Sequence, residues 1–214
     1  MEVGVREILR YLRMREEEAD GGLLTKLRGL TEELAGMIRP KAVFHRCGCR
    51  VDETEVRFMD CRIRSLHLAR HLKGCRELYL FAATLGPGPD RLAARYRVTD
   101  RAGMVMVQAA ATAMIERFCG EEQAKLAAAC REEGLYVKPR FSPGYGDCSL
   151  DCQKEFFRRL DITRRIGVSL TEGKMMTPTK SVTAWIGITE RDDCYAGKCG
   201  RCPNGDCEFR EEIE

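Results

Sequence analysis

Several features that would assign a protein class at once are missing from this 214-residue sequence. Its longest apolar stretches, such as Leu78–Leu85, are far too short to span a bilayer, and the segment after Met1 has no apolar signal region. Neither sign of charge dominates, because 36 Lys and Arg stand against 33 Asp and Glu, a net charge of +3. We therefore expect a cytoplasmic protein with no membrane association and no nucleic-acid partner.

Cysteine, in contrast, is abundant, with 12 residues. Without a secretory signal we expect reduced thiols or metal ligands rather than a disulfide framework. The C-terminal spacing C-x4-C-x2-C-x4-C is short enough for four thiolates to converge on one centre, and four sulfur ligands suit zinc or an iron–sulfur cluster. The ligands of this predicted metal site are Cys194, Cys199, Cys202 and Cys207. A reduced tail without metal is the alternative.

The remaining cysteines show no comparable spacing. Cys47 and Cys49 are expected at a turn between two short strands, where two ligands one residue apart are poorly placed to chelate a metal even with Cys61 nearby. We interpret them as ordinary thiols. Cys148 and Cys152 form a C-x3-C pair that we expect to be incidental rather than redox-active.

The order of the expected elements indicates the fold class. Apolar residues at helical spacing and turn residues predict helices over 5–14, 23–38, 65–72, 91–96, from Thr99 or Asp100 to near Gly120, and over 121–133, 153–160 and 163–166. Strands are expected over 42–44, 55–59, 77–84, 135–140, 168–171 and 181–189. There is no regular βαβ alternation, so we predict an α+β domain with a largely antiparallel twisted sheet over residues 1–191. Residues 192–214 form a separate Cys-rich tail.

The most distinctive local feature is the segment Arg140–Gly146, in which a strand delivers an arginine into a turn with one proline and two glycines. Glycine permits close approach of a ligand to the main chain, and the arginine fork suits a carboxylate in bidentate geometry. Tyr145 adds a flat face and a hydroxyl. Taken alone, the segment is equally compatible with a tight surface turn that holds Arg140 in a salt bridge.

Other segments narrow this choice. The pattern Arg-x-x-x-Gly-Tyr in the turn, the strand and glycine turn within Leu78–Arg91, the helix segment Ala109–Phe118 and the strand segment Pro178–Trp185 together resemble the activation domain of cobalamin-dependent methionine synthase. The resemblance covers roughly residues 75 to 190.

This resemblance implies a ligand and a set of site residues. The family's domain binds S-adenosylmethionine, so Arg140 would meet the methionyl carboxylate, and Ser142, Gly144 and Tyr145 would line the ligand largely through backbone. Glu116, near the end of the long helix, is the candidate acid for the ligand's ammonium group. A solvated helix residue remains the alternative for Glu116.

The function that follows by resemblance is accessory. A free-standing chain of this kind would support reductive remethylation of cob(II)alamin on a partner corrinoid methyltransferase, most naturally methionine synthase, with a flavodoxin or ferredoxin as possible electron donor. No acid or base residue is nominated, because no proton moves. The alternative is an iron–sulfur redox carrier or metal-binding module serving a corrinoid system, in which the Arg140 turn is only scaffolding.

Overall fold

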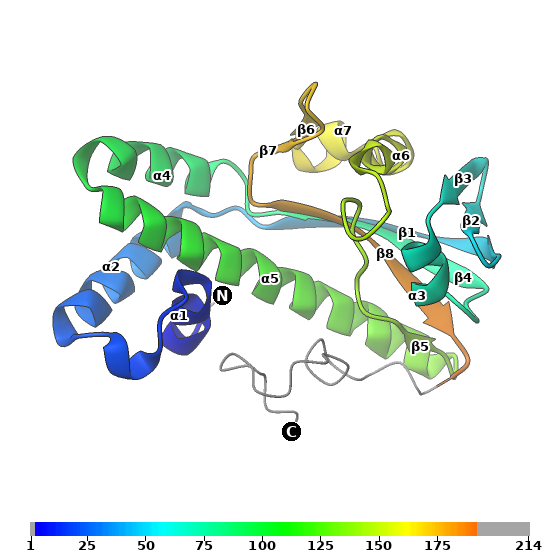
Figure 1. Cartoon of the computed structure of the whole chain (residues 1–214), viewed down its shortest axis with the longest axis horizontal. Coiled ribbons are helices and arrows are strands. Elements are labelled where there is room, and N and C mark those ends of the chain that lie inside the picture. The colour runs from blue at the N-terminus through cyan, green and yellow to red at the C-terminus, as the bar shows by residue number, and fades with distance from the viewer. Residues whose placement is uncertain (1–2, 192–214) are drawn as a thin grey trace. The chain divides into compact units, whose positions relative to one another are not determined.

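The computed structural model describes residues 3–191 (Figure 1). These residues form two compact units, and segments of the two alternate along the chain. The first unit contains residues 3–44, 81–123 and 153–183, and the second contains residues 45–80, 124–152 and 184–191. Three strands and the longest helix contribute residues to both units.

A six-stranded sheet has the order β3-β2-β1-β4-β8-β5. Its strands are β1 (Lys41–Val51), β2 (Glu55–Phe58), β3 (Cys61–Arg64), β4 (Glu77–Thr84), β5 (Tyr136–Val137) and β8 (Ser181–Thr189), and a separate two-stranded sheet pairs β6 (Ser169–Leu170) with β7 (Met176–Thr177). The β1–β2, β2–β3 and β5–β8 pairs are antiparallel. The expected α+β class with a largely antiparallel sheet is confirmed.

The helices account for most of the remaining regular structure. They are α1 (Val5–Leu12), α2 (Gly21–Met37), α3 (Leu66–His71), α4 (Gly88–Thr99), α5 (Arg101–Glu132), α6 (Gln153–Leu160) and α7 (Ile162–Ile166), with short 3-10 turns at Glu16–Glu18 and Leu150–Cys152. Among these helices, none combines the length and apolar character that crossing a membrane requires.

In the first unit, the leucine spacing of the sequence becomes a buried helix face. Leu27, Leu30 and Leu34 of α2 are at most 5% exposed. Helix α4 begins against the end of α2, where a Cβ on Gly88 would lie only 2.3 Å from the Met37 carbonyl oxygen. Glycine is therefore needed at the start of α4, because a larger side chain would force the two helices apart.

The structure differs from the expected elements at the first cysteine pair. Cys47 and Cys49 lie inside β1 and not at a turn, because the amide of Cys49 donates to the Arg76 carbonyl (2.8 Å) and Cys49 is in register with Phe58 of β2. The reversal comes later, at residues 52–54. Pairing of β1 with β2 overrides the local turn preference of Gly48.

The long helix also differs from expectation. Helix α5 runs without interruption from Arg101 to Glu132, so Gly120 does not divide it in two. One interior glycine costs a helix only about 1 kcal/mol. Cys119 and Leu126, on either side of Gly120, are buried, and the stability gained from burying them outweighs the cost of the glycine. Asp100, one of the two residues at which this helix was expected to begin, caps α5 by accepting a hydrogen bond from the Gly103 amide (3.1 Å).

Asp90 lies inside the first turn of α4 rather than at its start. Helix α4 already begins at Gly88, and the Asp90 carboxylate instead accepts hydrogen bonds from the amide (2.9 Å) and hydroxyl of Thr179.

Candidate functional site

The segment that carries the predicted turn is held to strand β8. Phe141 exchanges two backbone hydrogen bonds with Trp185, at 2.9 and 2.8 Å, and the Lys138 amide donates to the Gly187 carbonyl at 2.8 Å. These bonds continue the β5–β8 pairing to the edge of the turn. Because side chains alternate along an extended segment, Arg140 and Ser142 point to the opposite side from Phe141.

The turn closes on itself through three backbone hydrogen bonds. The Gly144 amide donates to the Cys148 carbonyl (2.8 Å), the Tyr145 amide to the Ser142 carbonyl (3.3 Å), and the Cys148 amide to the Tyr145 carbonyl (3.0 Å). Within the described part of the chain, the amides of Ser142 and Gly146 and the Ser142 hydroxyl make no hydrogen bond. These groups can therefore bind a ligand without breaking the turn.

The two aromatic rings of the turn have different environments. Phe141 lies against His71, with ring centroids 5.3 Å apart, and against Tyr145, with centroids 6.3 Å apart in an edge arrangement. The Tyr145 side chain is nevertheless 64% exposed. Its ring is thus held from one side and presents its remaining surface and hydroxyl to an incoming molecule.

Asp147 fixes the end of the turn to helix α3, a role that sequence reasoning missed. Its carboxylate accepts hydrogen bonds from the Ser65 hydroxyl (2.5 Å) and from the amides of Leu66 (2.6 Å) and His67 (3.1 Å) at the start of the helix. These bonds, that from Ser65 foremost, hold the pKa of Asp147 well below its usual value. The sequence predicted a helix beginning at Ser65 but gave no hint of a partner 82 residues away.

Gly146 makes this attachment possible. Its φ is +57°, a left-handed conformation, and a Cβ placed there would lie 2.5 Å from Nδ1 of His67. The same His67 nitrogen is 3.1 Å from an Asp147 carboxylate oxygen. The close approach of turn and helix therefore requires glycine at this position on two independent grounds, backbone conformation and space.

Four of the five predicted ligand residues lie together in this turn. Arg140 and Ser142 are half-buried, whereas Gly144 and Tyr145 are exposed. The fifth, Glu116, is half-buried on the portion of α5 that belongs to the first unit.

A family model described as vitamin B12-dependent methionine synthase, activation domain, matches residues 68–207, more than half of the chain and all of this turn. The chain belongs to this family. The resemblance noted from the sequence motifs is thereby confirmed.

Structural comparison is consistent with membership of this activation-domain family. The solved structure described as the MetH reactivation domain bound to AdoHcy matches with a TM-score of 0.66 over 90% of this chain and 75% of that chain, at 15% sequence identity. At that identity the match establishes a shared fold. No curated protein sequence matches the chain.

The predicted metal ligands of this activation-domain chain, Cys194, Cys199, Cys202 and Cys207, lie outside the described residues. Within residues 3–191, no group of three or more His, Cys, Asp or Glu side chains is placed to hold a metal ion.

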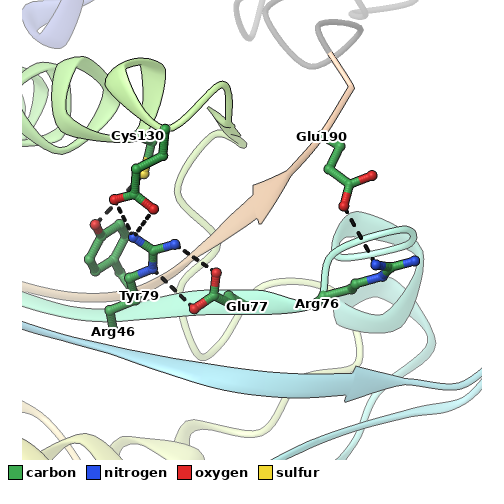
Figure 2. Close-up of polar contacts among 7 residues, drawn as sticks. Arg46, Arg76, Glu77, Tyr79, Cys130 and Glu190 are labelled. Carbon is green, nitrogen blue, oxygen red and sulfur yellow. Dashed lines mark hydrogen bonds and ion pairs between the residues drawn. The ribbon is translucent and has the colours of Figure 1, made fainter.

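The second unit also has a cavity of about 660 Å³, lined by polar residues that include Arg46, Arg76 and Glu190. Figure 2 shows the pairing of Arg46 with Glu77. The N–O distances from Arg46 are 2.7 Å to Glu77 and 2.7 Å to Glu133, so two carboxylates share this guanidinium. The hydrogen bond to Glu133, and to a lesser extent that to Glu77, raises the pKa of Arg46 above its usual value. This cation is already neutralised, and none of the predicted ligand residues lines the cavity, so we assign it no role in ligand binding.

Proposed function

We propose that the chain binds S-adenosylmethionine at the Arg140–Gly146 turn and supports reductive remethylation of cob(II)alamin on a partner corrinoid methyltransferase. The observation that carries this proposal is the gathering of Arg140, Ser142, Gly144 and Tyr145 on one turn that keeps unused backbone amides. Family membership and the fold shared with a reactivation domain solved with AdoHcy support it.

The chemistry of the turn fits the proposed ligand. The Arg140 guanidinium can pair with the methionyl carboxylate in bidentate geometry, and the Ser142 amide and hydroxyl can bind the same end of the ligand. The exposed ring of Tyr145 offers a flat surface to the adenosine. The Gly144 amide is already bonded to Cys148, so Gly144 would contribute its close backbone approach rather than a donor. Glu116 is the proposed partner of the ligand's ammonium group.

The proposed reaction requires the protein mainly to position the ligand. The corrinoid, carried by the partner, would take up one electron from an external donor such as a flavodoxin or ferredoxin and would then accept the methyl group of the sulfonium. Since no proton is transferred, no general base is needed, and the chain's residues act by fixing the sulfonium methyl in one orientation. Arg140 contributes most to this orientation, because a charged fork at the far end of the ligand fixes its direction as well as its position.

The C-terminal cysteines extend this proposal. Four thiolates at Cys194, Cys199, Cys202 and Cys207 suit zinc, which would be structural, or an iron–sulfur cluster, which could relay the electron from a flavodoxin or ferredoxin. The family match reaches residue 207 and so includes all four. Metal analysis of the anaerobically purified chain distinguishes the two.

A turnover assay tests the function. The full chain is mixed with S-adenosylmethionine, titanium(III) citrate as reductant, and the cob(II)alamin-loaded cobalamin-binding portion of a methionine synthase, and S-adenosylhomocysteine is quantified by chromatography. We expect product to form only with all components present. The Arg140→Ala variant should lower kcat/KM for S-adenosylmethionine roughly tenfold to a hundredfold, the loss expected for one charged hydrogen-bonded pair.

The matched control is Arg131→Ala, which removes an exposed arginine from α5 in the same unit. It should leave the rate unchanged. Product formation that is equal in both variants would assign the ligand to another part of the chain, and no product above the level of the partner alone would contradict the proposed function.

A further inference from the structure

Two thiols lie side by side immediately after the ligand turn. The Sγ atoms of Cys148 and Cys152 are 4.0 Å apart, and neither cysteine is part of a disulfide. The 3-10 turn Leu150–Cys152 causes this approach, because it folds the short segment between them back on itself. The C-x3-C spacing alone gave no reason to expect it.

The segment between these thiols is coupled to the turn by backbone and by packing. Cys148 accepts the Gly144 amide hydrogen bond and donates its own amide to Tyr145. Leu150 packs against Gly144 so closely that a Cβ on the glycine would lie 2.9 Å from a Leu150 methyl carbon. Any change in the backbone of residues 148–152 is therefore transmitted to the residues proposed to line the ligand.

We propose that Cys148 and Cys152 form a reversible disulfide, and that this modification weakens S-adenosylmethionine binding at the Arg140–Gly146 turn. The effect on the ligand rests on the proposed function, whereas the disulfide itself does not. The oxidant is a small disulfide such as oxidised glutathione.

The exchange balances in two steps. The Cys152 thiolate is the more accessible, and it attacks one sulfur of the small disulfide to give a mixed disulfide and one glutathione thiolate. Cys148 Sγ then attacks Cys152 Sγ, the bond between Cys152 and glutathione breaks, and the Cys148 proton passes to the departing glutathione sulfur. Two protein thiols are oxidised, two electrons reduce one small disulfide to two thiols, and an excess of reduced thiol reverses both steps.

The structure indicates why oxidation would disturb the turn. A disulfide requires the sulfur atoms to approach from 4.0 Å to about 2 Å. Cys148 is only 2% exposed, so packing restrains its side chain. The movement then falls to the half-buried Cys152, through its side chain and the backbone of residues 149–152, and any shift of Leu150 is carried to Gly144 by their contact.

The disulfide is tested by differential alkylation and peptide mass spectrometry of the full chain, after incubation with oxidised glutathione. We expect a Cys148–Cys152 link that reduced glutathione removes and that Cys152→Ser abolishes. Cys61→Ser, which alters a half-buried cysteine on β3, is the control and should retain the link. Failure to form the link in the wild-type chain would overturn the inference.

Two further measurements test the consequence. Hydrogen exchange should show faster exchange of the Gly144 and Cys148 amides in the oxidised chain, and S-adenosylmethionine affinity should fall at least tenfold and recover on reduction. Unchanged exchange, or unchanged affinity in a linked chain, would overturn the switch. If the reduced chain binds no S-adenosylmethionine, the proposed function fails, while the link and the exchange rates still decide whether this disulfide controls the turn.

Discussion

Replacing Gly146 with alanine tests whether the ligand turn depends on its close attachment to α3. An alanine at φ +57° carries the left-handed backbone cost of roughly 1–2 kcal/mol. Its Cβ would also lie 2.5 Å from Nδ1 of His67, and relieving such an overlap typically costs a further 1–3 kcal/mol. We therefore expect Gly146→Ala to lower the free energy of unfolding by about 2–5 kcal/mol.

The chain offers a control that isolates the backbone cost. Gly134 also has a left-handed φ, of +72°, but a Cβ there meets no atom within 4 Å. Gly134→Ala should lower the free energy of unfolding by only about 1–2 kcal/mol. The assay is urea unfolding of both variants followed by circular dichroism, with equal m-values as the check that only stability has changed. Equal destabilisation by the two substitutions would refute the claimed contact between Gly146 and His67.

Three other outcomes follow from the described contacts. The pKa of Asp147 is lowered in the folded chain, so the stability that this carboxylate contributes is complete above its usual pKa of about 3.9 and is lost as the pH falls through the folded-state pKa. Asp147→Asn should therefore lower the melting temperature at pH 7, and the melting temperature of the variant should decline less steeply in acid than that of the wild type. Gly187→Ala should lower the free energy of unfolding by about 1–3 kcal/mol, because the new Cβ would lie 2.6 Å from Cys75 Sγ and 2.7 Å from a Leu72 methyl carbon, and a stability equal to wild type in urea would contradict that packing. Burial raises the pKa of Cys49 to about 12, so iodoacetamide at pH 8 should label it slowly in the folded chain and rapidly in urea, as read by peptide mass spectrometry.

Local patterns in the sequence were enough to predict much of the fold. Three elements have the expected bounds, namely the strands Glu77–Thr84 and Ser181–Thr189 and the helix Gln153–Leu160. Each has a clear apolar pattern over its whole length. The errors came where a single glycine was read as a break. At Gly48 and Gly120, strand pairing and helix burial override the local preference, and neither is visible in one sequence.

The candidate site was predictable in part for a similar reason. Arg140–Gly146 is contiguous, so its residues had to lie together wherever the turn lay. The attachment of Asp147 to Ser65 spans 82 residues of sequence, and the approach of Cys148 to Cys152 depends on a 3-10 turn; both are products of the folded backbone that no spacing rule supplies.

Isothermal titration of the reduced, anaerobically purified chain with S-adenosylmethionine tests the central claim most directly. We expect saturable binding with one site per chain, an affinity lower by about 1.5–3 kcal/mol in Arg140→Ala, and no change in Arg131→Ala. Absence of binding by the wild-type chain, or equal binding by wild type and Arg140→Ala, would contradict the assignment of the ligand to this turn.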